Sequence, residues 1–254
     1  MNTRQFRRLG VAPALITVLA ILVTSCTGGD EVRVEKVFTG PPWSGDEVSH
    51  YNLIDSGGEV YGTCSLETRP EFEPGKTKLS RLCGDGPNRD DGTAVVDART
   101  LKPYSAIRVI SDGEKNKRTT FTASYGEDSV RFTADSNGKL NETERDLPKP
   151  DETSPDPGWY DDESLLWLVR GIDLKQGYEA AYKNVNAGNG RVFSVELKVE
   201  TAEKVKVPAG EFRAWKVRIR TDSITQYAWV GVEAPHTLIR ARIERLTYEL
   251  TGSE

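Results

Sequence analysis

The sequence is poor in residues that build metal and redox sites. Its 254 residues include three cysteines, two histidines and one methionine, whereas a structural zinc site uses four Cys or His ligands at close spacing. Basic residues are also outnumbered, with 34 Lys and Arg against 39 Asp and Glu and a net charge of −5. Nucleic-acid binding needs a basic face. We therefore expect no metal, no cofactor and no nucleic-acid partner.

Long apolar runs are also scarce. The run 9–24 has 16 residues, fewer than the roughly 20 that a membrane-spanning helix needs. It follows Arg4, Arg7 and Arg8 and ends in small residues, which is the order of an export signal. Such a segment can be an ordinary cleaved signal or an uncleaved membrane anchor, and its last four residues offer a third interpretation.

The end of this run is Val23-Thr24-Ser25-Cys26. It resembles the lipobox of bacterial lipoproteins, although Val23 stands where Leu is commoner. The resemblance implies that Cys26 becomes the first mature residue and carries a diacylglyceryl group, often with a third chain such as palmitate, and two or more chains anchor stably. We therefore expect a signal peptide at 1–25, a tether at 26–30 and one domain at 31–254. The protein would lie outside the cytoplasm at the cell membrane, or at the outer membrane where the host has one.

Processing at Cys26 leaves only Cys64 and Cys83. In an oxidising compartment two cysteines favour one disulfide, and closing a loop of about 20 residues contributes roughly 3 kcal/mol in the chain-entropy model. Two free thiols and a metal or redox pair are the alternatives. The spacing is unlike C-x-x-C, and no histidine lies near either cysteine.

Apolar and polar residues then alternate with a period of two, the pattern of an antiparallel sheet with one wet face. Pro208 and Gly210 suit the second and fourth positions of a type I turn, and residues 147–158 form a polar, Pro-rich loop. The pattern predicts about ten strands, which fall within 32–38, 48–54, 59–66, 104–110, 121–125, 129–134, 178–185, 191–199, 205–219, 224–232 and 236–250.

One segment, Trp159 to Ile172, predicts a helix. Asp161 or Asp162 can cap it, and Glu163 adds negative charge to its first turn. The segment is apolar almost all round, which is typical of a helix buried on several sides. We therefore expect a mostly β protein in which a strongly curved antiparallel sheet, a half-barrel, wraps round one buried helix.

The second half of the chain also carries a family resemblance. Residues 161–170, the turn 207–212 and the segment 234–240 resemble an uncharacterised family of exported bacterial proteins, the domain of unknown function 3108 type. That family is similar in fold to the lipoprotein carrier LolA and the receptor LolB, half-barrels closed by helices. The resemblance covers roughly 100–250 and implies the same fold here. It does not reach Cys64 and Cys83, so the disulfide prediction rests on the residues alone.

The candidate ligand-pocket residues are Trp167, Trp215 and Trp229, whose rings would line any gap between the sheet and the helix. The alternative is that they fill the core. Ligand pockets are mostly apolar with a few polar groups. The acidic run 161–163 could form an acid–base pair, but helix capping explains it more simply.

Other polar groups have plain interpretations. Residues 85–91 hold acidic and amide side chains but lack the spacing of an EF-hand, so a solvated loop is favoured over a calcium site. His50 and His236 fit no catalytic motif. Several arginines recur on the late strands, either as a basic face for an acidic partner or, more simply, as a solvated face; they are Arg218, Arg220, Arg240, Arg242 and Arg245.

Together these features favour a non-enzymatic, membrane-anchored lipoprotein. Its half-barrel would bind an apolar or amphipathic ligand, such as a lipid or a lipid-linked glycan, by burial of the apolar part. This rests on fold-level analogy. The alternative is a structural or protein-interaction lipoprotein of the cell envelope with a filled core. An envelope hydrolase comes third, because no spacing joins a histidine to a nucleophile.

Overall fold

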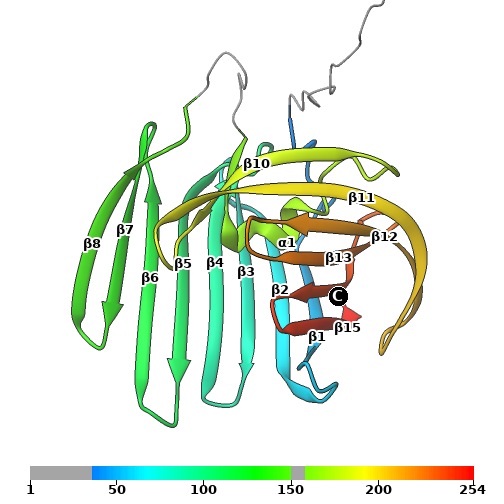
Figure 1. The fold of residues 1–254 in the computed structure, drawn as a ribbon, viewed down its shortest axis with the longest axis horizontal. Coiled ribbons are helices and arrows are strands. Elements are labelled where there is room, and N and C mark those ends of the chain that lie inside the picture. The colour runs from blue at the N-terminus through cyan, green and yellow to red at the C-terminus, as the bar shows by residue number, and fades with distance from the viewer. Residues whose placement is uncertain (1–35, 150–157) are drawn as a thin grey trace, which may run out of the picture. The chain divides into compact units, whose positions relative to one another are not determined.

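One curved sheet dominates the computed structural model, which describes residues 36–149 and 158–254 (Figure 1). The strand order across it is β8-β7-β6-β5-β4-β3-β2-β1-β15-β14-β13-β12-β11-β10-β9. The strands of the described residues are β1 (Glu47–Ile54), β2 (Val60–Glu73), β3 (Lys76–Asp85), β4 (Asn88–Asp97), β5 (Pro103–Asp112), β6 (Lys117–Tyr125), β7 (Ser129–Ser136), β8 (Lys139–Asp146), β9 (Trp159–Asp161), β10 (Glu179–Asn186), β11 (Arg191–Val207), β12 (Gly210–Arg220), β13 (Thr225–Gly231), β14 (Leu238–Ile243) and β15 (Leu246–Ser253).

The first and last strands meet in the middle of this sheet. β1 pairs with β15, so β1 to β8 form one antiparallel meander outward and β9 to β15 form a second that returns from the opposite edge. The one exception is β9, which pairs parallel with β10. The predicted mostly β, strongly curved sheet is confirmed, but the sheet is mixed rather than wholly antiparallel.

Alternation along each strand sorts the side chains between the concave and convex faces. On β12, Val217 and Ile219 are buried inside the curve, whereas Arg218 between them faces out. The cross-strand partners of the two apolar residues on β13, Ala228 and Gln226, are buried as well. The concave face therefore holds the core.

The helical segment is shorter than predicted. It consists of a 3₁₀ turn, η1 (Asp162–Ser164), and α1 (Leu165–Leu168). The prediction of a helix over 159–172 is wrong at both ends for tertiary reasons. The residues before Asp162 pair with β10 instead. After α1 the carbonyl of Gly171 accepts from the backbone N–H of Thr39, and the absence of a side chain lets Gly171 lie against the Phe38 ring. The segment is nevertheless buried inside the curve of the sheet, as predicted.

Side chains link β9 to the concave face of β6. Trp159 stacks on Tyr125 with ring centroids 5.6 Å apart, and the Tyr125 hydroxyl donates to the fully buried Asp161 carboxylate. Burial raises the pKa of both groups above their ordinary values. β6 and β9 are not hydrogen-bonded neighbours in the sheet. These side-chain contacts therefore connect the two strands across the interior of the curve.

Several strands were not expected from the sequence. β3 and β4 carry charged residues on both faces, and β8 is exposed at every position, so none of them shows a clean apolar alternation. The expected strand at 32–38 is not one over its described part, 36–38, where Val37 and Phe38 are nonetheless buried. The predicted 236–250 strand divides into β14 and β15.

Other expectations have mixed outcomes. Pro208 and Ala209 form the turn between β11 and β12, where Val207 pairs with Gly210. A disulfide joins Cys64 on β2 to Cys83 on β3. The signal peptide, the tether with Cys26, and residues 150–157 of the Pro-rich loop lie outside the described residues. Among the helices that the structure describes, none has the length and apolar character needed to cross a membrane.

Candidate functional site

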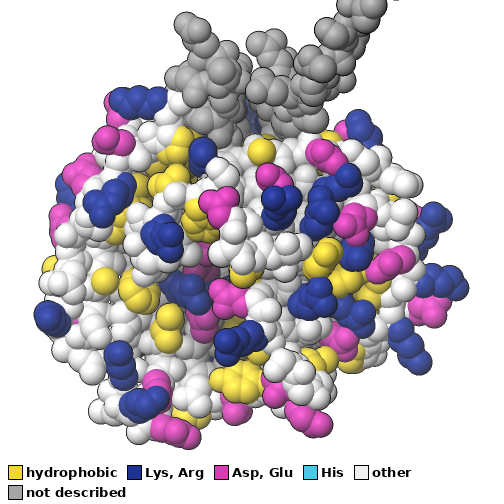
Figure 2. Space-filling view, viewed as in Figure 1, with side chains coloured by type: hydrophobic (Ala, Val, Ile, Leu, Met, Phe, Trp, Pro, Cys, Tyr) yellow, Lys and Arg dark blue, Asp and Glu magenta, His cyan; other side chains and the backbone are white. Residues whose placement is uncertain are grey.

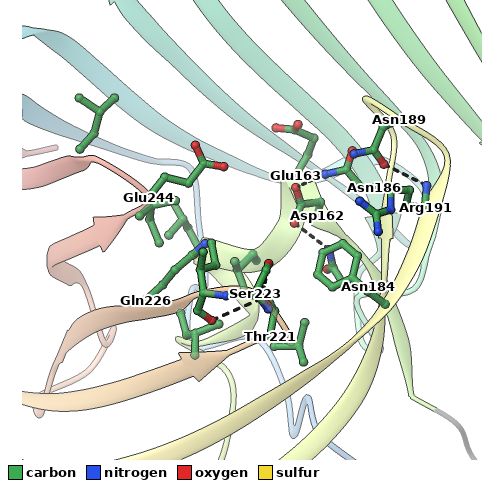
Figure 3. Close-up of a pocket in the computed structure, with 18 of the residues that line it drawn as sticks. Asp162, Glu163, Asn184, Asn186, Asn189, Arg191, Thr221, Ser223, Gln226 and Glu244 are labelled. Atoms are coloured by element: carbon green, nitrogen blue, oxygen red, sulfur yellow. Dashed lines mark hydrogen bonds between the residues drawn. The ribbon is translucent and has the colours of Figure 1, made fainter.

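A cavity of about 570 Å³ lies inside the curve of the sheet (Figure 3). This is within the range of about 300–1,000 Å³ typical of small-molecule sites. One wall is apolar and one region is polar and charged. The apolar wall comes from the helical segment and the late strands and consists of Leu165, Leu166, Phe193, Val195, Ile219, Ile224, Ile243, Leu246 and Tyr248.

The charged region contains a four-residue cluster that brings distant segments together. Arg81 on β3 lies 3.0 Å from Glu163 on η1 and 3.3 Å from Asp90 on β4. Arg108 on β5 lies 2.7 Å from the second oxygen of Asp90 and 3.9 Å from Glu163. Each acid therefore contacts both arginines, and positive and negative charges alternate around the cluster.

Electrostatics keeps this cluster charged. Burial alone would lower the pKa of Arg81, but the Glu163 carboxylate beside it raises that pKa above its ordinary value. Burial alone would raise the pKa of Asp90, but hydrogen bonds from Arg108 and the charge of Arg81 lower it below its usual value. Buried charges need such pairing, because removal of one partner leaves the other as an uncompensated buried charge.

The backbone of β4 makes room for this cluster at Gly92. A Cβ at this position would lie 1.9 Å from Oε2 of Glu163 and 3.2 Å from a terminal nitrogen of Arg81. Any side chain there would displace the carboxylate, so the glycine lets Glu163 lie directly on the sheet.

Asp162 forms a second polar group beside the cluster (Figure 3). Its two oxygens accept hydrogen bonds from the Nδ2 atoms of Asn184 at 2.7 Å and Asn186 at 2.8 Å, both on β10. Burial, with the nearby Glu163 charge, raises the pKa of Asp162 to about 6. Asp162 therefore titrates much closer to neutral pH than an exposed aspartate does.

The acidic run 161–163 thus has three different roles. Asp161 caps the helical segment by accepting from the backbone N–H of Glu163 at 2.8 Å, as expected. Asp162 and Glu163 lie in the first turn of the helical segment, where Glu163 was expected. Their side chains also line the cavity, which the capping interpretation did not predict.

The three predicted tryptophans do not line this cavity. Trp167 is 1% exposed, and its Nε1 donates to Oγ1 of Thr68 on β2 at 2.8 Å. Trp215 packs against the core. Trp229 lies on the convex face, where its Nε1 donates to Glu203 at 2.5 Å. From the helical segment this cavity is lined instead by Asp162, Glu163, Leu165 and Leu166, and a ligand-lining role for the three rings stays a prediction.

The remaining candidates are accounted for elsewhere. His50 contacts Glu254 at the surface, and Nδ1 of His236 lies 2.9 Å from the Gly231 carbonyl oxygen. Residues 88–91 belong to β4 rather than to a loop. Within 36–149 and 158–254 no group of three or more His, Cys, Asp or Glu side chains is placed to hold a metal ion.

The late arginines do not form a face of one sign. Arg220 pairs with Glu196 and Arg240 with Glu249, while Arg245 lines the cavity. Arg218 and Arg242 flank Tyr227 across the sheet. In Figure 2 basic and acidic side chains are interspersed over the visible face, as a solvated surface requires.

Sequence reasoning missed Arg81, Asp90 and Arg108. Arg108 gave the clearest available signal, because it is the one charge in the otherwise uncharged run 104–110. An arginine among apolar strand residues must face a partner or water. Its partner could not be identified, because Asp90 lies 18 residues earlier and Glu163 55 residues later in the sequence.

A curved β-sheet with a polar and apolar internal cavity defines a half-barrel protein. The chain belongs to a family of proteins of unknown function, DUF3108, whose family model matches residues 85–247. The curated proteins include no match.

Of the three solved structures described next, the first has a TM-score above 0.5 and shares the fold. A β-barrel-like protein of the domain of unknown function DUF1849 from Brucella abortus is similar with a TM-score of 0.51 and 11% identity, over 86% of this chain and 98% of that one. A candidate lipoprotein from Parabacteroides distasonis matches with a TM-score of 0.31 and 13% identity, over 86% of this chain and 99% of that one. A candidate exported protein with a YmcC-like fold from Bacteroides fragilis matches with a TM-score of 0.29 and 15% identity, over the same shares.

Proposed function

We propose that this protein is a non-enzymatic, lipid-anchored binding protein outside the cytoplasm, and that its cavity holds an apolar or amphipathic ligand such as a lipid or a lipid-linked glycan. The observation that carries this proposal is the cavity itself, whose lining combines apolar side chains with polar and charged ones. An amphipathic molecule has both kinds of surface, so each part of it would find matching side chains in the cavity.

The apolar wall supplies the driving force. Removing apolar surface from water stabilises a complex by about 25 cal/mol per Å², or about 0.8 kcal/mol per buried CH₂. Leu166 and Ile219, from the helical segment and β12, belong to this wall. A short acyl chain buried there would provide several kcal/mol, enough to offset part of the cost of association.

The location in this proposal rests on the sequence before residue 30. Its basic start, apolar run and lipobox-like ending are those of an exported lipoprotein. Acyl chains on Cys26 would hold the protein at the membrane surface, within reach of lipids. Cys26→Ser should abolish incorporation of labelled palmitate; labelling that survives this change would overturn the anchor.

Native mass spectrometry tests ligand binding most directly. Residues 27–254 are exported into a periplasm and purified without detergent. A stoichiometric extra mass that extracts into organic solvent supports a binding protein and identifies the ligand class. A bare mass, together with no displacement of any apolar dye, contradicts the proposal.

Two matched isoleucines localise the binding. Ile224 lines the cavity and is 39% exposed, whereas Ile107 lies outside it and is 42% exposed. Ile224→Gln should weaken binding of an apolar dye about fivefold through lost apolar contact. Ile107→Gln should leave dye binding unchanged. If the two substitutions weaken binding equally, the dye does not bind in this cavity.

A second candidate function, an envelope protein that binds another protein, rests on β8. This edge strand pairs only with β7, and all eight of its side chains are exposed. Open edges can receive a strand from a partner, and the charges on β8 oppose self-association. A photo-crosslinker at Asn141 should then capture a specific envelope protein, and capture of none contradicts this function.

A further inference from the structure

We infer that the cavity recognises an uncharged, hydroxyl-bearing head group, such as the sugar of a glycolipid, rather than an anionic or cationic one. The inference rests on the proposed function and specifies the ligand class. It follows from which polar groups in the cavity already have partners and which do not.

The carboxylates of the polar region are already matched. Glu163 and Asp90 each face Arg81 and Arg108, and Asp162 accepts from two asparagine amides. A cationic head group would therefore have to break an existing pair to gain one of its own. Breaking a buried ion pair is unfavourable, because it leaves an uncompensated charge behind.

An anionic head group is disfavoured for a related reason. The deep arginines, Arg81 and Arg108, are engaged by these acids. The whole lining carries four arginines and five carboxylates, a net formal charge of −1. The two arginines of the lining outside the cluster, Arg191 and Arg245, are exposed to solvent. A phosphate or carboxylate would therefore meet a net negative charge that only solvated arginines could compensate.

The charged side chains of the lining outside the cluster and Asp162 are exposed to solvent; they are Arg191, Asp222, Glu244 and Arg245. The buried polar atoms of the lining that have no partner are neutral acceptors. Within the described chain, Oδ1 of Asn184 and Oε1 of Gln226 are buried and accept no hydrogen bond. Asn184 is 1% exposed and Gln226 9%, and both side chains line the cavity. A buried acceptor without a donor is costly, so a ligand that donates to these atoms gains affinity.

A hydroxyl suits such atoms best. It donates one hydrogen bond and also accepts, so it can satisfy an amide oxygen without bringing a charge. Other neutral polar side chains lie nearby, among them Thr221 and Ser223 (Figure 3). Phe193, opposite Asn184 in the β10–β11 ladder, adds an aromatic ring that can cover the apolar face of a sugar.

A second cavity of about 380 Å³ adjoins the first. The two cavities share the wall residues Arg81, Asp90, Leu246 and Tyr248, and the second is also lined by the apolar side chains Leu53 and Ile110.

Four probes with the same tail separate head-group recognition from tail binding. Octyl glucoside, octyl phosphate, octylammonium and nonanoate each carry an octyl tail. They are titrated by calorimetry, below their micellar concentrations, into the full exported chain held in phosphatidylcholine nanodiscs, with empty nanodiscs as the blank. Octyl glucoside should bind at least about tenfold more tightly than the charged probes, the discrimination expected of one or two satisfied buried acceptors.

Gln226→Leu removes one of the two unpartnered oxygens at nearly constant side-chain volume. It should weaken binding of octyl glucoside about fivefold to tenfold and leave the charged probes unchanged. The matched control is Gln176→Leu, since Gln176 is exposed and lies outside the cavity. Thermal unfolding of both variants checks that the fold is retained.

The outcomes separate this inference from the proposed function. If all four probes bind within about twofold of one another, or a charged probe binds best, or Gln226→Leu has no effect, head-group recognition is wrong while amphipathic binding stands. If none of the probes binds, both fail.

Discussion

Arg81 and Glu163 lie 82 residues apart in the sequence, yet their side chains meet at 3.0 Å with only 12% and 5% of their surface exposed. One comes from a central strand and the other from the helical segment inside the curve of the sheet. This ion pair is therefore a direct link between the two parts of the fold, and it lies at the polar end of the cavity.

Removing one charge from this pair should be strongly destabilising. Glu163→Gln leaves Asp90 as the one acid of the cluster for both Arg81 and Arg108. The cluster then carries one uncompensated positive charge, and the free energy of unfolding should fall by about 3 kcal/mol. Urea denaturation followed by circular dichroism measures the loss. Glu196→Gln is the control, because the Arg220–Glu196 pair is 59% exposed on both sides and should change stability by less than about 0.5 kcal/mol. Equal losses would contradict the buried role of Glu163.

Asp162 should make stability depend on pH in an unusual direction. Its pKa in the folded protein is about 6, above the ordinary value of 3.8, so the folded state binds this proton more tightly than the unfolded state. The associated stability is fully present below pH 3.8 and is lost as the pH rises through 6. Compared with Asp162→Asn, the wild type should gain about 2 kcal/mol between pH 7 and pH 4.

Urea denaturation of both proteins at several pH values measures that gain. The control is Asp222→Asn, an exposed acid that also lines the cavity; its difference from the wild type should stay within about 0.5 kcal/mol. A wild type that loses stability relative to Asp162→Asn on acidification would contradict the raised pKa.

Gly92→Ala tests the close approach of Glu163 to β4. The added methyl would overlap the carboxylate, so we expect a loss of about 1–3 kcal/mol, the usual cost of overpacking. Gly252 on β15 has no atom within 4 Å of such a methyl, and Gly252→Ala should be neutral or slightly stabilising because alanine restricts the unfolded chain. If both variants lose the same stability, the loss comes from the effect of alanine on the strand and not from its contact with Glu163.

The Cys64–Cys83 bond joins residues 19 apart in sequence. Its removal in Cys64→Ala/Cys83→Ala should lower the unfolding free energy by roughly 3 kcal/mol, because the unfolded chain regains the entropy of an open loop. The exported wild type should also be about 2 Da lighter than its reduced form, since two hydrogens are lost when the bond forms. A mass unchanged by reduction would show that the two thiols are free in the exported protein.

The sequence predicted the fold class because alternation is a local signal. On β12, for example, Val217 and Ile219 alternate with Lys216 and Arg218. Such alternation indicates a strand with one buried face, wherever it occurs in a chain. β3 and β4 were missed for the opposite reason. Arg81 and Asp90 occupy inward positions, where they interrupt the apolar pattern that marks a buried face.

The candidate site was harder to predict than the fold. The tryptophans were chosen because large rings often line pockets, but Trp167 packs against β2 and Trp229 faces outward. Asp162 and Glu163 were identified as polar residues at a helix start, and their local sequence explains no more than that. Asn184 and Gln226 lie on β10 and β13, which are separate strands of the sheet. Only the folded structure shows that their side chains line the same cavity.

By itself the sequence determined the mostly β class, the buried helical segment and the Pro208 turn, because each depends on residues close together in the chain. The export signal also depends on local sequence and stays a prediction. Tertiary structure alone decided the length of the helix, the parallel pairing of β9 with β10, and the cavity. These depend on charges and amides that are far apart in sequence and become neighbours only when the sheet curves. Their partners cannot be read from local patterns, because the free energy of a buried charge is set by what the fold places beside it.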